Sequence, residues 1–176
     1  MKAAEALFAE RGYGDVGVAE LCERIGIAPP SLYSAWGSKL GLFEAALERY
    51  AQRIGARFGT VVTEATGRDV LWERLLREAA RLYTGAPGRG CLALESGGAA
   101  DVEVRTLAGR HAERTRRALA ERLETLGLSA SEADADSRAL LLALRGVSAS
   151  ARAGVGRAAL LRDVDALLVR AAGARR

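Results

Sequence analysis

The chain has 176 residues, enough to bury a core as one domain or as two small ones. Its composition is that of a soluble, helix-rich globular protein; no apolar run could span a membrane, and two distant cysteines suggest neither a disulfide framework nor a metal site. The formal net charge is +4, but residues 1–58 hold 7 basic and 7 acidic residues, so charge alone does not predict that this part binds nucleic acid.

The N-terminal residues predict a helix that begins at residue 1 or 2, runs to Arg11 and ends at Gly12. Glu5 and Glu10 lie where an export signal would have its apolar core, so we expect no such signal and a reducing, cytoplasmic location. A short turn follows at residues 13–15.

The stretch 17–39 carries the strongest pattern. Residues 18–25 have the i, i+3, i+4, i+7 apolar spacing of one buried helix face, and Gly26 follows where a left-handed residue commonly ends a helix. Two prolines then suit the first turn of a second helix, which Gly37 ends. Two short helices joined by a tight turn are typical of a helix-turn-helix, whose second helix enters the DNA major groove. An αα-hairpin within an ordinary helical core has the same spacing.

The next predicted helix begins with Ser38 as its N-cap and continues at close to heptad spacing as far as Phe58. A helix of twenty residues is about 30 Å long, so it can connect a DNA-reading head to a second domain. We therefore expect an all-α fold with two domains: a three-helix helix-turn-helix domain over 1–50, with its motif at 17–36, and a helical domain over 51–176.

The middle of the chain alternates loops and helices. Residues 59–68 predict a loop, and Asp69 predicts the cap of a helix over 70–84. The glycines of the loop over 85–90 resemble a phosphate-cradling loop only loosely; with no strand before it and no Gly-Lys-Ser/Thr in it, we reject a nucleotide-binding loop. Residues 91–95 predict a short buried helix that a glycine pair breaks.

Asp101 begins a long predicted helix that is charged on one face and runs to Leu126, and Gly127 ends it. Ser131 and Asp134 then resemble a capping box at the start of the following helix.

The last two predicted helices carry more apolar surface than one buried face requires. Residues 139–144 are consecutively apolar, which covers a helix all round, and the helix over 158–172 has a wide apolar stripe. The extra cover is most simply a second copy, so we expect a two-fold homodimer with a four-helix interface; the alternative is a thick monomeric core. The expected interface residues are Leu140, Leu141, Leu144, Leu160, Leu161, Val164 and Leu168.

The motif and the start of the next helix contain a specific combination of residues: Leu32-Tyr33, Trp36, Ser38-Lys39 and Leu42-Phe43. With these residues, the first part of the chain resembles the N-terminal domain of the TetR family of transcriptional regulators. The resemblance runs from Ala4 to about Tyr50, and beyond that it is only architectural. It implies a dimeric repressor in which the second domain binds a small molecule, which releases the two reading heads from a palindromic operator in double-stranded DNA.

The resemblance implies that Tyr33 and Lys39 contact DNA phosphates, and Lys39 also lies at a helix N-terminus, where the helix dipole attracts anions. Ser31 can add a hydroxyl and a backbone N–H to a phosphate. Ser34 and Ala35 face outward on the second helix of the motif, where they can reach base edges.

Three departures from the family pattern reduce direct base reading. Gly17, Ala19 and Pro29 stand where related chains usually place polar residues. We therefore expect specificity to depend on DNA shape, on backbone positioning and on an N-terminal arm, which related regulators carry before the first helix and which this sequence lacks or begins after.

The polar and aromatic candidates for an effector pocket are Trp72, Tyr83, Cys91, Glu95 and His111. Trp72 and Tyr83 can equally be plain core, Cys91 a small buried hydrophobe, and His111 a surface residue. With so few polar groups expected to point inward, the effector should be mostly apolar.

Two other classes of function compete with a regulator. An enzyme would need a nucleophile and base or a metal cluster; Cys91 with His111 is the only conceivable dyad, so we predict no catalytic residues, no metal, no cofactor and no enzyme. A helical interaction protein of the same fold that has lost sequence-specific DNA binding is the main alternative, because the head is neutral and its motif lacks polar residues.

Overall fold

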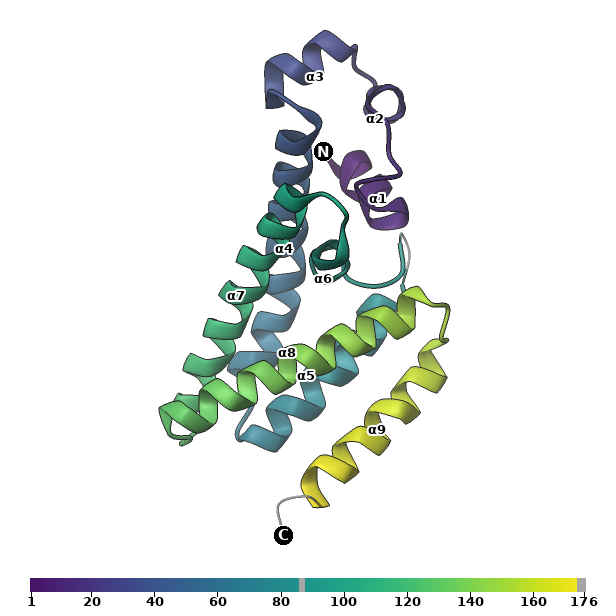
Figure 1. Ribbon diagram of the computed structural model, residues 1–176. Coiled ribbons are helices and arrows are strands. Elements are labelled where there is room, and N and C mark those ends of the chain that lie inside the picture. Colours follow the sequence, from purple (N-terminus) through teal and green to yellow (C-terminus); the bar gives the residue numbers. More distant parts are fainter. Residues whose placement is uncertain (86–87, 174–176) are drawn as a thin grey trace.

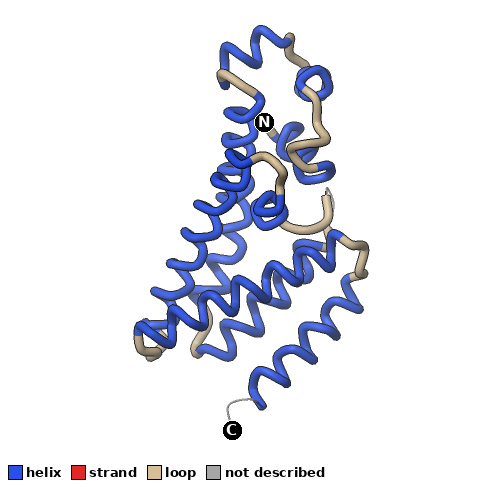
Figure 2. Tube along the Cα trace, in the orientation of Figure 1, coloured by secondary structure: helices blue, strands red, loops and turns tan. Residues whose placement is uncertain are grey.

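The computed structural model describes residues 1–85 and 88–173, and every element of secondary structure within them is helical (Figures 1 and 2). The all-α prediction is therefore confirmed. None of the helices in these described segments is long and apolar enough to cross a membrane. The elements are α1 (Lys2–Arg11), α2 (Val18–Ile25), α3 (Pro29–Trp36), α4 (Lys39–Thr63), α5 (Arg68–Tyr83), α6 (Leu92–Glu95), the 3₁₀ turn η1 (Ser96–Gly98), α7 (Val102–Thr125), α8 (Ala130–Arg152) and α9 (Arg157–Gly173).

The head consists of α1, α2 and α3 packed on the first turns of α4 (Figure 1). Its core is apolar: the side chains of Phe8 and Phe43 meet edge to face with ring centroids 5.1 Å apart, and Leu21 and Leu32 are fully buried beside them. Gly26 ends α2 with φ 79° and ψ 38°, a left-handed conformation in which its N–H donates to the Cys22 carbonyl at 2.9 Å. The predicted helix-turn-helix is thus present.

The helix α4 runs from the head into the body and is longer than the sequence predicts. The loop expected to begin at residue 59 starts only after Thr63, because Phe58, Val61 and Val62 pack against the core and outweigh the cost of a helical glycine, about 1 kcal/mol. The guanidinium of Arg122 from α7 accounts for the end point: it donates to the carbonyls at 62, 63 and 65 at 2.9, 3.1 and 2.7 Å and so satisfies groups left free at a helix C-terminus.

The body packs α4, α5, α7 and α8 side by side, with α6 inserted between them and α9 lying on α5 and α8. Asp101 caps α7 as predicted, accepting from the Glu103 and Val104 N–H groups at 2.9 and 3.1 Å. The capping box of α8 lies earlier than predicted, at Ser129 and Glu132. The predicted box residue Asp134 instead forms an ion pair with Arg116 at 2.6 Å.

The predicted loop over 85–90 is present in its described residues, while Ala86 and Pro87 lie outside the described part of the chain. This segment presses against the end of α1. A Cβ at Gly88 would lie 2.6 Å from the Ala9 carbonyl carbon and oxygen, and Arg152 of α8 donates to that same oxygen at 2.6 Å. The head is therefore fastened to the body at the C-terminal end of α1 as well as through α4.

Candidate functional sites

The outward face of α3 is the most exposed surface of the head, at the far end of the molecule from α9 (Figure 1). Leu32 anchors the helix with no exposed surface, so the residues on either side of it turn outward. Tyr33 is 50% exposed, which leaves its hydroxyl free to reach a ligand. The predicted contact residues Ser31, Ser34 and Ala35 are exposed on the same short helix.

Lys39 lies in the first turn of α4, close to this face. Its Nζ stands 4.1 Å from the centroid of the Tyr13 ring, a cation–π contact that holds the charge at the helix N-terminus. Partial burial lowers the pKa of Lys39, and Asp101 and Asp15 oppose that effect. The N-cap Ser38 accepts from the Gly41 N–H at 3.0 Å.

Gly41 is a position whose importance the spacing of apolar residues does not predict. A Cβ there would lie 2.1 Å from the carbonyl oxygen of Trp36, so only glycine allows α3 and α4 to meet at this corner. The corner fixes the angle between the exposed face of α3 and the lysine at the start of α4. Gly41 is therefore a positioning residue for the surface described above.

A partly open apolar pocket of about 270 Å³, which we call the chamber, lies in the body between α4, α5, α6, α7 and α8. Of the predicted pocket residues, Tyr83, Cys91 and His111 line it, together with Tyr50, which sequence reasoning places only at a domain boundary. The other lining residues are mainly Ala, Gly, Leu, Ile, Val and Phe. Among the lining residues of the described chain, none is Asp, Glu, Lys or Arg.

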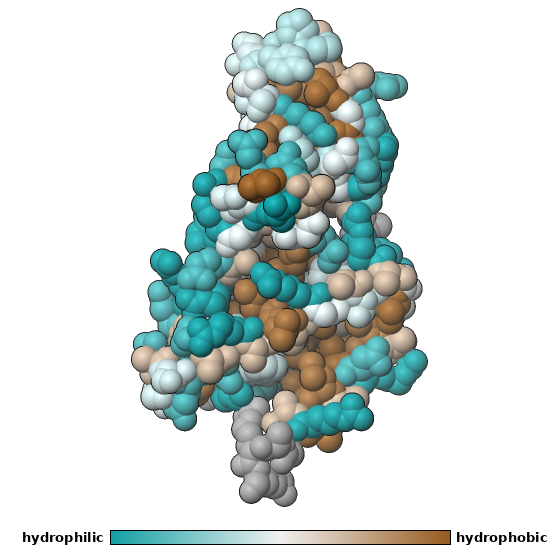
Figure 3. Space-filling view, viewed as in Figure 1, coloured by the Kyte–Doolittle hydropathy of each residue, from teal (hydrophilic) through white to brown (hydrophobic). Residues whose placement is uncertain are grey.

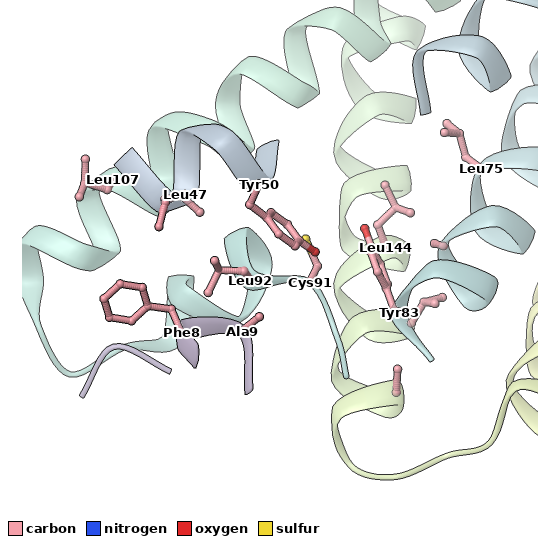
Figure 4. Packing of buried hydrophobic residues seen from close by; sticks show 14 of the residues in the cluster. Phe8, Ala9, Leu47, Tyr50, Leu75, Tyr83, Cys91, Leu92, Leu107 and Leu144 are labelled. Atoms are coloured by element: carbon pink, nitrogen blue, oxygen red, sulfur yellow. The ribbon is translucent and has the colours of Figure 1, made fainter. Parts of the chain in front are cut away.

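The polar end of the chamber is formed by a thiol between two phenols. Cys91 is hydrogen-bonded to the hydroxyls of Tyr50 and Tyr83, and Figure 4 shows the Tyr50 oxygen beside the Cys91 sulfur. Burial raises the pKa of all three groups, with hydrogen bonds from the phenols partly opposing the rise at the thiol. The end of the chamber is therefore uncharged at neutral pH and offers hydrogen bonds without a net charge.

His111 borders both the chamber and a group of charged side chains. Its Nε2 lies 3.6 Å from a Glu48 carboxylate oxygen. Burial is the main cause that lowers the pKa of His111, followed by repulsion from Arg114, while Glu48 opposes them. Since Cys91 bonds to phenols and its pKa is raised, the thiol is not activated as a nucleophile, and the conceivable dyad with His111 has no support.

Two predicted pocket residues lie elsewhere. Trp72 donates from Nε1 to Asp136 at 3.1 Å and borders a groove between α5 and α9. Glu95 accepts a 2.5 Å hydrogen bond from the hydroxyl of Ser148, which itself accepts from the Cys91 N–H at 2.8 Å. These contacts hold α5 and α6 in place against α8, so neither side chain faces the chamber.

The predicted dimer residues lie mostly inside the protomer. Five of them are buried within a single protomer, because α8 packs on α5 and α7, and α9 packs on α5 and α8; they are Leu140, Leu141, Leu144, Leu160 and Val164. Leu161 and Leu168 are half-buried against the same core. The exposed apolar residues of these helices are instead Leu142, at 69% exposure, Leu167 and Val169. Figure 3 shows apolar surface gathered over α8 and α9.

A helix-turn-helix head packs on a helical body that contains an apolar chamber, and this arrangement is typical of a DNA-binding regulator. A family model described as "Bacterial regulatory proteins, tetR family" matches residues 1–46. The structure of the TetR family regulator CifR, a cysteine mutant in complex with 26-base-pair operator DNA, superposes with a TM-score of 0.85. The two chains are 30% identical over 95% of this chain and 92% of that one.

Two curated relatives match shorter stretches. The repressor BdcR of Escherichia coli K12 is 36% identical over 109 residues, which are 61% of this chain and 55% of BdcR. The activator FasR of Mycolicibacterium smegmatis is 38% identical over 52 residues, 30% of this chain and 24% of FasR. The chain thus spans about half, or less, of the curated relatives it matches. On the full-length structural match, it belongs to the TetR family, so the prediction of a regulator and not an enzyme is confirmed.

Proposed function

We propose that the protein is a homodimeric repressor that binds a palindromic operator in double-stranded DNA and leaves it when a small molecule fills the chamber. The observation that carries the proposal is the near full-length superposition on CifR, whose structure contains operator DNA. The two proposed domains are the head over 1–50 and the ligand-binding and dimerisation domain over 51–176, with α4 shared between them.

The proposed DNA contacts are Ser31, Tyr33, Ser34, Ala35 and Lys39. All but Lys39 are exposed, and the lysine charge is held by the Tyr13 ring at the start of α4, where the helix dipole adds to it. Two other arginines of the head are paired within it: Arg11 with Glu20 and Arg24 with Glu10. Phosphate contacts by a few groups, combined with a fixed α3–α4 corner, fit a reader that depends on DNA shape more than on base edges.

The proposed effector is an uncharged, mostly apolar molecule small enough for about 270 Å³. A charged ligand would lose its hydration without meeting an opposite charge, which costs several kcal/mol. A single hydrogen-bonding group on the ligand would find partners at Tyr50, Tyr83 and Cys91.

Release follows from how the chamber is joined to the head. Cys91 and α6 form one chamber wall, and the residues just before them pack on α1 at Gly88 and Ala9. A ligand that displaces α6 or α4 therefore moves α1, and the spacing of the two reading heads changes with it.

The proposed dimer uses the last two helices, through the face that the protomer leaves uncovered. On α8 this face is a stripe of exposed small and apolar residues at i, i+4, i+7, i+11 and i+14: Ala135, Ala139, Leu142, Gly146 and Ala149. Small residues allow two α8 helices to approach closely, and α9 adds Leu167 and Val169 at the edge.

Fluorescence anisotropy on operator-sized duplexes from the DNA beside the protein's own gene tests the proposal. We expect saturable binding that weakens with salt, and a smaller salt slope for Lys39→Ala, because one phosphate contact is lost. Arg117→Ala, an exposed arginine of α7 outside the head, is the control and should leave the curve unchanged. If the anisotropy shows no saturable binding at low salt, the result would support the alternative, an interaction protein that has lost DNA binding. A reporter assay decides between repression and activation.

A further inference from the structure

A second hollow, which we call the joint cleft, lies where the head meets the body. It has a volume of about 610 Å³ and is lined by residues of α1, α4 and α5, by Gly85, Gly88 and Gly90, and by the start of α9. In Figure 1, α1 lies directly above the corner between α8 and α9, beside this segment. The joint cleft differs from the chamber in chemistry, because its walls are densely charged.

The charge of the joint cleft is predominantly positive. Its acidic lining residues are Glu5 and Glu78, and its basic lining residues are Lys2, Arg49, Arg53, Arg57, Arg81 and Arg157. The arginines at 49, 53 and 57 recur every four residues of α4, so they form one ridge along the helix. Even with both carboxylates ionised, the described walls carry an excess of four positive charges.

The two carboxylates are shared among four of the arginines. Glu5 accepts from Arg53 at 2.6 and 3.1 Å and lies 3.4 Å from the Arg49 Nε. That Nε–H is sheltered from water and makes no hydrogen bond within the described chain. Glu78 lies 3.4 Å from Arg57 and 3.6 Å from Arg81.

Lys2 and Arg157 take part in none of the ion pairs between described residues, so their charges have no carboxylate to offset them. The Arg157 Nε makes a 3.3 Å contact to the Thr84 hydroxyl, which carries no charge. These two cations lie on opposite walls, one on the head and one on the body.

An anion with several charges can compete with the existing pairs. Exposed ion pairs such as those of Arg57 and Arg81, with side chains 62% and 55% exposed, contribute about 0–1 kcal/mol each. Guanidinium groups bind phosphate oxygens through two parallel hydrogen bonds, which are about twice as strong as neutral ones. A phosphate chain would thus gain more from the arginines than they lose.

We propose that the joint cleft binds a small molecule carrying a di- or triphosphate group, and that such a ligand bridges head and body. The volume lies within the range typical of small-molecule sites, about 300–1,000 Å³. DNA is not the ligand here: Arg49 is ten residues from Lys39 along α4, a distance of about 15 Å, and the other arginines of the ridge lie still farther from the reading face.

The proposal also gives a role to the glycines between α5 and α6. Gly85, Gly88 and Gly90 form part of the wall, where the absence of side chains leaves the backbone open to a ligand. The segment is not a nucleotide-binding loop of the strand-and-helix type, since it follows α5. Its contribution to the site is space beside the arginines.

Isothermal titration calorimetry with inorganic tripolyphosphate, at constant ionic strength, tests the proposal. We expect saturable binding to the wild type and binding weakened at least about tenfold by the double substitution Arg81→Gln and Arg157→Gln. Arg162→Gln is the matched control, because Arg162 is also exposed on α9 but does not line the joint cleft. The affinity of this variant for tripolyphosphate should stay within about twofold of that of the wild type. Circular dichroism melting checks that each variant is folded.

A parallel titration with a nucleoside triphosphate distinguishes a site for nucleotides from a site that recognises the phosphate chain alone. Tighter binding than tripolyphosphate, lost in the double variant, indicates a nucleotide; equal binding indicates that the phosphate chain alone is recognised. No saturable binding by the wild type, equal affinity in the double variant, or an equal loss in Arg162→Gln would overturn the proposal. None of these outcomes affects the proposed DNA binding, which the anisotropy assay measures separately.

Discussion

Gly41 shows how one residue without a side chain fixes the geometry of the head. The prediction is that Gly41→Ala destabilises the protein by about 1–3 kcal/mol, because the new methyl group would lie 2.1 Å from the Trp36 carbonyl oxygen and must force α3 and α4 apart. Gly109→Ala on α7 is the control: it meets nothing within 4 Å and should stabilise by about 0.4–1 kcal/mol. Urea unfolding measures both. Equal stability changes would show that the corner has room to relax.

His111 provides a test of charge at the edge of the chamber. Burial lowers its pKa in the folded protein below the value of about 6.5 that it has in the unfolded chain, so the unfolded chain binds the proton more readily. We therefore predict that the free energy of unfolding has its full value above a pH of about 6.5. It should fall as the pH drops from there through the lower pKa of the folded protein. The substitution His111→Gln should flatten this part of the profile.

Urea unfolding at a series of pH values, with wild type and variant side by side, checks the pH prediction. The charged groups that face His111 are Glu48, Arg114, Arg110 and Glu44. Parallel profiles for the two proteins would mean that other groups carry the acid dependence.

Helix boundaries show what local sequence can and cannot predict. The end of α2 at Gly26 and the cap of α7 at Asp101 follow from one residue and its immediate neighbours, and both are confirmed. The end of α4 is set by Arg122, sixty residues away along the chain, which no local pattern contains. The predicted capping box of α8, at Ser131 and Asp134, lies two residues after the observed one at Ser129 and Glu132. The two serine–acid pairs overlap and have the same spacing, so the motif alone does not distinguish them.

The exposed stripe of α8 is the surface through which we propose that two protomers meet. Leu142 is 69% exposed at the centre of the stripe, so the prediction is that Leu142→Lys breaks the dimer and leaves the protomer folded. Light scattering after gel filtration should then give a mass near the 18.6 kDa of one chain. Val102→Lys, at a residue of α7 that is 63% exposed, is the control and should remain dimeric. A dimeric Leu142→Lys protein would place the interface elsewhere.

The molecule as a whole is less predictable from sequence than its head. The motif at 17–36 is local, so its spacing predicts two short helices joined by a tight turn, and the family resemblance of the residues around them identifies a helix-turn-helix. The chamber brings together α4, α5, α6, α7 and α8, and only the tertiary packing places Tyr50 against Cys91 or turns Glu95 away toward Ser148. Apolar periodicity predicts that a helix has a buried face; it does not predict which cavity that face borders.

Arg152 joins the two parts of the molecule at the C-terminal end of α1. It donates to the Ala9 carbonyl at 2.6 Å and lies within 3.4 Å of the Arg89 carbonyl, so it ties the end of α8 to the end of α1 and to the segment before α6. Removing it with Arg152→Ala should free the C-terminal turn of α1 without opening the cores on either side. The predicted result is hydrogen exchange at least about tenfold faster in a peptide covering residues 1–12, with a small change in global stability.

Arg145→Ala is the matched control, because Arg145 is exposed on the same helix and forms no ion pair with any described residue. Exchange in α1 should be unchanged in that protein. A head held less firmly samples more orientations, so Arg152→Ala should also weaken operator binding, since fewer molecules have both heads at the right spacing. If α1 exchanges at the wild-type rate in Arg152→Ala, the link through Gly88 and α4 alone is sufficient to hold the head, and communication between chamber and reading face must run along α4.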